Sequence, residues 1–340
     1  MCGIAGELRL DGAAPDPGTL QRMVDTLARR GPDGEGVFRD GPVQFGHRRL
    51  AIIDLTERST QPMVDRDAGL ALVFNGTIYN YPTLRAELIA KGHPFQSDGD
   101  TEVILRAFAE WGEACVERLH GMFAFALWDA RAGRLFLARD RLGIKPLYYS
   151  RTANGIRFAS TTQALLAAGG VDTGIDPIAL HHHLTLHAVV PAPRTLMNGV
   201  RKLAPASSLS IGLDGGAREH VYWRLSARRP EKVMTEADWQ AAIHDSLCEA
   251  VRKRIAIADV KVGVLLSGGL DSSLLVGLLA EQGVGDLLTF SIGFEDQPEE
   301  RGHEFEYSDA VAAHFGTRHH FYQIPNSEVL ARMPEAVDAM

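Results

Sequence analysis

Three absences in the 340-residue sequence limit what this protein can be. Only three cysteines are present, Cys2, Cys115 and Cys248, so no disulfide framework is expected and a reducing, cytoplasmic setting is predicted. No uninterrupted apolar run is long enough to span a bilayer, and Glu7 and Arg9 break the first one, so neither a membrane span nor a secretory leader is expected. The net charge of −8, with both signs interspersed, offers no basic surface for nucleic acid.

The composition that is present predicts a globular protein of two domains. Hydrophobic residues make up 45% of the chain, enough for a sizeable core, and the length suits two domains. Up to about residue 220, short strand patterns outnumber helical ones, and a hairpin is expected at 123–128 and 135–138. This mixture favours layered sheets flanked by helices.

A different pattern follows, beginning with one long amphipathic helix at 239–255. Strands and helices are then expected to alternate, with strands at 262–266, 288–292 and 320–324 and helices at 270–281 and 308–315. Such alternation is typical of a parallel sheet. The predicted boundaries are 1–215 for the first domain, 216–235 for a linker that includes a charged, proline-containing segment, and 236–340 for the second domain.

Cys2 is the first residue whose position suggests chemistry. If Met1 is removed, Cys2 carries both a thiol and a free α-amine, whose ordinary pKa is about 8. The thiolate can attack a carbonyl while the adjacent amine takes and returns the proton, so no distant histidine is needed. The alternative is a small buried cysteine in a first strand.

A second candidate site joins a buried strand to a helix at 264–273. Its glycines let the backbone approach an anion, and the amides of the turn and of the helix N-terminus supply donors. Since no Gly-Lys-Ser/Thr follows, this is not a Walker loop; a cradle of amides and hydroxyls suits pyrophosphate as a leaving group, and hence adenylation. An ordinary strand-turn-helix is the alternative. The predicted ATP contacts are Leu266, Ser267, Gly268, Gly269, Asp271, Ser272 and Ser273, with Asp271 also holding Mg²⁺.

The two sites, together with six further runs, resemble the glutamine-dependent asparagine synthetase family along the whole chain. The runs are 29–33, 47–50, 74–76, 99–102, 121–125 and 139–148. The resemblance implies an α+β class II glutamine amidotransferase domain, an N-terminal-nucleophile sandwich of two sheets between helices (αββα). An α/β, Rossmann-like ATP-pyrophosphatase domain with a parallel sheet is implied next. Family members continue well beyond this length, so the chain is expected to be a truncated piece with glutaminase chemistry but without full synthetase activity.

The resemblance also implies roles for residues of the first domain. Cys2 attacks the side-chain amide of glutamine, and the Asn75 side chain and the Gly76 amide form the oxyanion hole. Arg49 pairs with the glutamine α-carboxylate, and Asp100 holds the α-ammonium. The structural alternatives are solvated surface charges for Arg49 and Asp100, and a hairpin turn for Asn75-Gly76.

One departure from the family bears on the acceptor. The family usually has glutamate where this chain has Thr77, so the glutamine ammonium loses one anchor. Weaker glutamine binding is expected, and the alternative is that another acidic residue substitutes. With the segment 180–195, this departure resembles members that amidate N-acetylglutaminylglutamine, an acetylated dipeptide used in osmoprotection. Aspartate, giving asparagine, is the alternative acceptor. In both cases the carboxylate is adenylated and ammonia displaces AMP.

In the second domain, Ser291 and Ile292 at the end of a parallel strand are expected to lie against the adenine. The expected partners are small molecules (glutamine, ATP with Mg²⁺ and a carboxylate acceptor) and a second copy in a homodimer, without nucleic acid or membrane. Cys115 and Cys248 are expected to be small buried side chains. The alternatives of another class are a stand-alone glutaminase or amidase and a non-catalytic nucleotide-binding protein.

Overall fold

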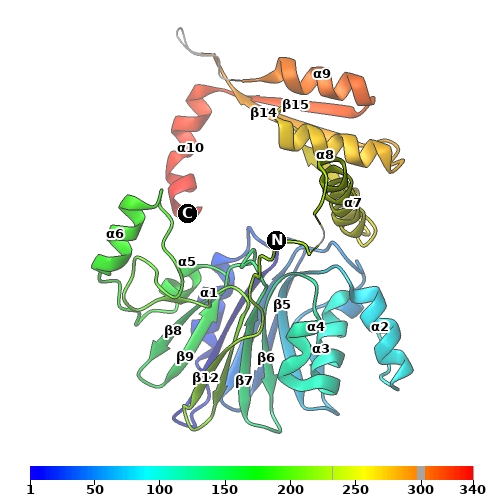
Figure 1. Ribbon diagram of the computed structural model, residues 1–340. Helices are drawn as coiled ribbons and strands as arrows, with labels where there is room; N and C mark the ends of the chain where they lie inside the picture. Colours follow the sequence, from blue (N-terminus) through cyan, green and yellow to red (C-terminus); the bar gives the residue numbers. More distant parts are fainter. Residues whose placement is uncertain (232, 297–302, 340) are drawn as a thin grey trace. The chain divides into compact units, whose positions relative to one another are not determined.

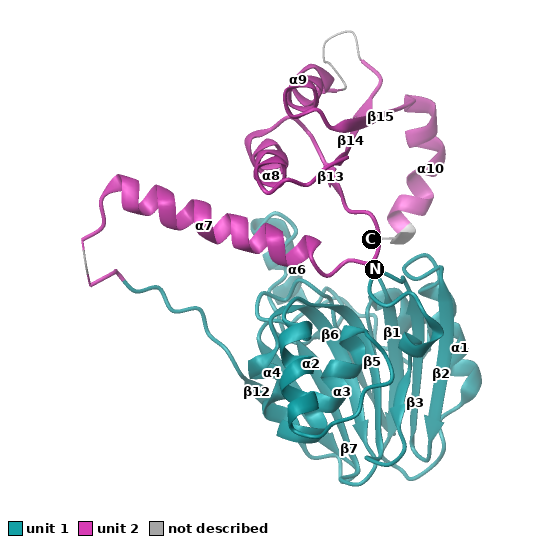
Figure 2. Ribbon diagram, turned by 90° about the vertical axis from the view of Figure 1, so that its right-hand side faces the viewer, with its two compact units in different colours: residues 1–228 teal, residues 229–340 magenta. Residues whose placement is uncertain are grey.

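The computed structural model describes residues 1–231, 233–296 and 303–339; Met340, the last residue of the predicted second domain, lies outside the described residues. The chain divides into two compact units, Met1–Arg228 and Arg229–Met340 (Figure 2). Each unit has its own hydrophobic core and is described by itself. In the part of the chain described, no helix has both the length and the apolar character needed to cross a lipid bilayer.

The first unit is built on two six-stranded antiparallel sheets (Figure 1). From edge to edge, the first sheet contains β10 (Arg201–Lys202), β8 (Tyr148–Thr152), β9 (Gly155–Ala159), β1 (Gly3–Arg9), β3 (Val43–Arg49) and β2 (Gly34–Asp40). The second contains β12 (Ala217–Val221), β11 (Ser207–Gly212), β7 (Arg134–Arg139), β6 (Gly121–Asp129), β5 (Leu70–Ile78) and β4 (Met63–Asp65). Apolar side chains of both sheets form one shared core, in which Phe45 and Phe158 pack edge to face at 5.5 Å.

Helices cover the outer faces of the two sheets (Figure 1). The first sheet is covered by α1 (Pro17–Thr26) and α5 (Thr162–Ala167), and the second by α2 (Tyr81–Ala90), α3 (Asp100–Trp111) and α4 (Cys115–Arg118). The unit also contains α6 (Pro177–Thr185) and the short 3₁₀ turns η1 (Glu57–Ser59) and η2 (Gly112–Ala114). Helix α1 forms because its apolar residues recur at helical spacing and Asp16 caps its first amides. The arrangement is the αββα sandwich that the resemblance implied, so this prediction is confirmed.

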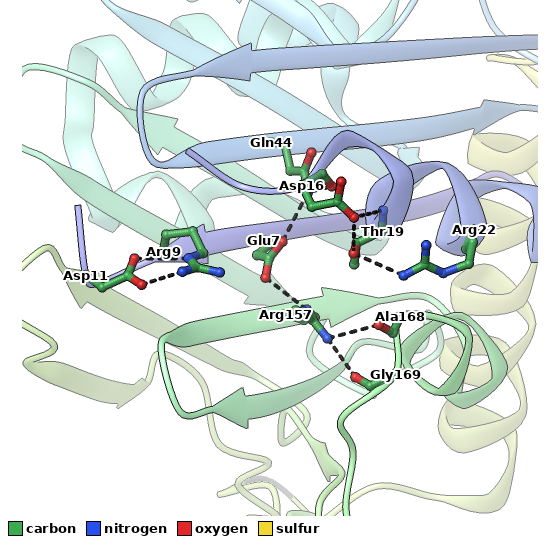
Figure 3. Close-up of polar contacts among 10 residues, drawn as sticks. All are labelled: Glu7, Arg9, Asp11, Asp16, Thr19, Arg22, Gln44, Arg157, Ala168 and Gly169. Carbon is green, nitrogen blue, oxygen red and sulfur yellow. Dashed lines mark hydrogen bonds and ion pairs between the residues drawn. The ribbon is translucent and has the colours of Figure 1, made fainter. Parts of the chain in front are cut away.

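A buried polar network holds strand β1 in its register (Figure 3). Glu7, only 2% exposed, accepts hydrogen bonds from Arg157 Nε at 2.9 Å and from Gln44 Nε2 at 3.0 Å. Arg157 also donates to two backbone carbonyls that follow α5. A buried charge is costly unless it is paired, and a slip of one residue would turn Glu7 to the other face of the sheet. The network therefore fixes the strand that begins directly after Cys2.

The second unit is a small α/β layer. It begins with α7 (Glu236–Ile255), and continues with β13 (Gly263–Leu265), α8 (Leu270–Glu281), β14 (Leu288–Phe294), α9 (Phe305–Phe315), β15 (Arg318–Ile324) and α10 (Asn326–Ala339). Thr235 and Asp238 form a reciprocal capping box at the start of α7. The three strands pair in parallel in the order β13-β14-β15, which confirms the predicted parallel sheet.

Two details differ from the sequence-based expectations. Strand β12 falls inside the predicted linker 216–235 and pairs with β11 over five residues. Every side chain of β12 is exposed, so this edge strand carries no buried pattern that the sequence could reveal. The hairpin-turn alternative for Asn75-Gly76 is wrong, because both residues lie inside β5, opposite Ala124 and Phe123 of β6.

Candidate active site

One cavity of the first unit collects all the residues that the resemblance assigned to glutamine. Its volume is about 290 Å³, and its lining includes Cys2, Arg49, Asn75, Gly76 and Asp100. The antiparallel pairing of β1 with β3 explains part of this convergence, since the start of β1 lies beside the end of β3, where Arg49 stands. Strand β5 and the first turn of α3 contribute the other three residues.

The Cys2 thiol is held by the backbone of Leu50. The Leu50 amide donates to Sγ at 3.4 Å, and Sγ lies 3.6 Å from the Leu50 carbonyl oxygen. Burial raises the pKa of the Cys2 thiol, while the hydrogen bond from Leu50 and the nearby N-terminal charge act to lower it. A thiol in this setting needs a base close by to become a nucleophile.

Asn75 and Gly76 face the cavity from the middle of β5. Asn75 is 1% exposed, and its Nδ2 has no hydrogen-bond partner among the described residues. A Cβ added at Gly76 would lie 2.2 Å from the carbonyl oxygen of Met122 on β6, so only glycine fits the close approach of the two strands. The site therefore holds a buried side-chain donor that forms no hydrogen bond with any residue the structure describes.

The Arg49 guanidinium is not a solvated surface charge. It donates to the backbone carbonyls of Thr56, at 2.9 Å, and Asp54, and so ties down the loop that follows β3. Burial acts to raise the pKa of Asp54, but hydrogen bonds from Thr56, Ser59 and the Asp98 amide lower it to about 2. The Asp54 carboxylate therefore organises the loop that carries part of the cavity wall.

Asp100 is the first residue of α3 and is almost completely buried. Its carboxylate accepts a hydrogen bond from the Ile78 amide at 3.0 Å. Burial raises the pKa of Asp100 to about 7, although the amides that it faces act to lower it. A buried carboxylate at a cavity wall, with a pKa near neutral pH, is suited to binding a cationic ligand.

Lys145 is a cavity residue to which sequence reasoning assigned no role. Its side chain is 5% exposed, its Nζ lies 3.1 Å from the Met1 sulfur, and burial lowers the pKa of its ammonium. Lys145 lies in a turn whose backbone amides donate hydrogen bonds to the buried carboxylate of Asp140. One of them is the Lys145 amide, at 2.9 Å. The run 139–148 matched the family, but a lysine in a turn ordinarily indicates a solvated charge.

The second predicted site lies in the second unit, where β13 leads into α8. The serines of this loop bond to one another: the Ser267 amide donates to Ser272 Oγ at 3.2 Å, and the Gly269 amide donates to Ser267 Oγ at 3.2 Å. Gly268 has a φ of +84°, and a Cβ there would lie 2.5 Å from the Cβ of Tyr307. Only glycine permits this tight turn.

The other predicted nucleotide residues surround this loop to different degrees. Ser273 Oγ is buried and has no hydrogen-bond partner among the described residues. Ser291 is brought against the loop, but its hydroxyl donates to the Leu266 carbonyl. Asp271, in the first turn of α8, and Ile292, at 62%, are exposed. The loop therefore offers free donors at a helix N-terminus, the arrangement that binds phosphate groups.

Comparisons with known proteins match both units. Residues 1–223 match the family described as glutamine amidotransferase domain, and residues 242–340 match asparagine synthase. In Bacillus subtilis (strain 168), asparagine synthetase [glutamine-hydrolyzing] 3 is 35% identical, over 99% of this chain and 56% of the relative. Asparagine synthetase [glutamine-hydrolyzing] 1 of the same organism is 37% identical, over 99% of this chain and 52% of the relative. The chain thus spans about half the length of these curated relatives.

A solved structure supports the fold. Glutamine phosphoribosylpyrophosphate (PRPP) amidotransferase from B. subtilis superposes with a TM-score of 0.53 and 16% sequence identity, covering 97% of this chain and 92% of that chain. At this identity the likeness concerns the fold alone, and it agrees with an N-terminal-nucleophile sandwich. With both domain matches and the near-complete coverage of this chain by its relatives, the protein belongs to the glutamine-hydrolysing asparagine synthetase family.

Proposed function

We propose that this protein is a glutamine-dependent amidotransferase that delivers ammonia to a carboxylate activated by ATP. The observation that carries the proposal is one cavity lined by both Cys2 and Asn75, whose buried side-chain Nδ2 lacks a partner among the described residues. A buried donor without an acceptor is unfavourable, so such groups usually signal a ligand or a catalytic role. An oxyanion forming beside the thiol would be that acceptor.

The proposed glutaminase reaction begins once Met1, which is 54% exposed, has been removed. The Cys2 thiol passes its proton to its own α-amine, and the thiolate attacks the side-chain carbonyl of glutamine. The tetrahedral intermediate collapses to a thioester and expels ammonia, which takes the proton back from the amine. Water then hydrolyses the thioester to glutamate. Arg49 and Asp100 carry the opposite charges that suit the α-carboxylate and α-ammonium of glutamine.

The raised pKa of Asp100 leads to a prediction of how glutamine binding depends on pH. Its pKa is raised to about 7, so in the free protein the carboxyl is neutral below that pH and cannot pair with an ammonium group. The KM for glutamine should therefore rise as the pH falls below about 7, approaching tenfold per pH unit. Glutamate release measured between about pH 5.5 and about pH 8.5 checks this. Asp100→Asn should raise KM and abolish the inflection; an unchanged inflection would assign the titration to another group.

For the second unit, we propose that residues 236–340 lie in an ATP-pyrophosphatase domain. The part of the predicted linker 216–235 that follows β12 would join it to a glutaminase domain made of residues 1–215 and β12. The N-terminus of α8 and the Ser273 hydroxyl, which has no hydrogen-bond partner among the described residues, suit the phosphates of ATP. Asp271 is the carboxylate that would hold Mg²⁺ on phosphate oxygens, since Mg²⁺ commonly uses one or two carboxylates together with phosphate. Bound ATP would activate a carboxylate by adenylation and release pyrophosphate.

The proposed acceptor is N-acetylglutaminylglutamine, on the basis of Thr77, which lines the cavity, and of the segment 180–195. Aspartate is the second candidate, because the relatives are named asparagine synthetases. The protein expressed from its own gene should be incubated with amide-labelled glutamine, ATP and Mg²⁺, and with each acceptor in turn. Labelled amide together with AMP and pyrophosphate is expected with the dipeptide. The same products with aspartate alone would assign asparagine synthesis, and glutamate release without AMP in either mixture would favour a stand-alone glutaminase.

A further inference from the structure

A cluster of three potential metal ligands lies on the second unit, outside the proposed nucleotide loop 266–269. His244 and Cys248 are one helical turn apart on α7, and Glu281 is the last residue of α8. Their ligand atoms all lie within 4.8 Å of one another. Cys248 is half-buried rather than fully buried, which corrects the expectation of a small core side chain.

The distances within the cluster are already near those of a tetrahedral site. Cys248 Sγ lies 3.7 Å from His244 Nε2, and Glu281 Oε2 lies 3.0 Å from the same nitrogen. Zinc bonds of about 2.3 Å to sulfur and about 2.0 Å to nitrogen at tetrahedral angles place neighbouring ligand atoms about 3.5 Å apart. Small rotations of exposed side chains, without movement of either helix, would therefore let all three reach one ion.

The two helices that carry these ligands are fixed against each other. The residue after Glu281 is Gln282, and its side-chain Nε2 donates a hydrogen bond to the backbone carbonyl of Cys248 at 3.0 Å. Val251 of α7 and Val276 and Leu279 of α8 share one buried cluster. A preformed arrangement lowers the entropy lost when an ion binds.

We propose that His244, Cys248 and Glu281 form a binding site for a zinc-class divalent cation that clamps α7 to α8. Thiolate, imidazole and carboxylate together suit Zn²⁺, and three protein ligands leave the fourth position to water on the exposed side. On binding, the Cys248 thiol becomes a metal-bound thiolate and its proton is released to solvent. The His244–Glu281 hydrogen bond is given up, since the same nitrogen becomes a ligand.

Titration with Co²⁺ and Zn²⁺ tests this site without any need for enzymatic activity. The parent for the titration is Cys2→Ala, because Cys2 with its α-amine would itself bind metal, and Cys115 is fully buried. Co²⁺ should then produce a thiolate-to-cobalt charge-transfer band that depends on Cys248 alone. Zn²⁺ should displace the Co²⁺, and Zn²⁺ added to metal-free protein should release about one thiol proton per ion at neutral pH.

Four variants in the same background decide the outcome. Cys248→Ala should abolish the band, while His244→Gln and Glu281→Gln should each weaken binding about tenfold or more. His314→Gln, an exposed histidine of α9 in the same unit, is the matched control and should change nothing. The proposal is overturned if the band survives Cys248→Ala, or if His244→Gln and Glu281→Gln bind as tightly as the parent. Far-ultraviolet circular dichroism verifies that every variant is folded.

Discussion

Replacing Cys2 with alanine should abolish glutamate release from glutamine, lowering kcat by a factor on the order of 10³ or more. The expectation follows from the proposed chemistry, in which the thiol forms the covalent intermediate and no other described cysteine lines the cavity. Thermal unfolding should change little, because the thiol makes only weak contacts with the backbone of Leu50. Glutamate release under saturating glutamine and an unfolding curve measure the two effects separately.

The matched control is Cys115→Ala. Cys115 is the fully buried first residue of α4, so this substitution should lower the free energy of unfolding by about 1 kcal/mol and leave kcat unchanged. Intact mass must also show that Met1 is absent from active protein, since the free amine of Cys2 is the proposed base. Active protein that retains Met1, or Cys2→Ala with undiminished turnover, would contradict the mechanism.

Replacing Asn75 with alanine should lower kcat for glutamine hydrolysis by about 10²- to 10³-fold, with a small effect on KM. The side-chain Nδ2 has no acceptor among the described residues, so its hydrogen bond would be formed with the oxyanion of the transition state. For the same reason, the substitution removes an unsatisfied buried donor. The free energy of unfolding should therefore fall less than for a buried amide that is bonded.

Gln44 provides that comparison for the side-chain donor within the same unit, since its Nε2 is bonded while its Oε1 has no partner among the described residues. Its buried Nε2 donates to Glu7 and to the Asp16 carbonyl, both at 3.0 Å. Gln44→Ala should lower the free energy of unfolding by about 2 kcal/mol while leaving kcat unchanged. A large loss of kcat in Gln44→Ala, or a loss of stability without a loss of kcat in Asn75→Ala, would reverse the roles assigned to the two amides.

The elements that sequence patterns predicted well are those stabilised by local information. The hairpin around residue 132, the long helix that precedes β13 and the β-α-β-α-β order all appear in the structure. Their hydrophobic periodicity and turn residues lie within a few positions of one another. Strand β12 was missed because it is exposed throughout and is defined only by its pairing with β11.

The residues of the candidate sites also fall into those that sequence patterns indicate and those that only the folded structure reveals. Cys2 and the run 264–273 attract attention through adjacent residues, whereas Lys145 does not, because a lysine in a turn gives no sign that it is buried. The partial exposure of Cys248 and its nearness to Glu281 could not be read from the sequence either, since they depend on how α7 packs on α8. Burial of a polar group is a property of its neighbours in space.

By itself, the sequence predicted layered sheets flanked by helices, followed by a parallel-sheet domain, and its short motifs resemble those of the glutamine-dependent asparagine synthetase family. Those features follow from periodicity and short motifs, which act over neighbouring residues. Only the tertiary structure decided that Cys2, Asn75 and Asp100 line one cavity, that the Asn75 side-chain Nδ2 lacks a partner among the described residues, and that the pKa of Asp100 is about 7. Desolvation and hydrogen bonding depend on segments far apart in the chain, and folding alone brings these segments together.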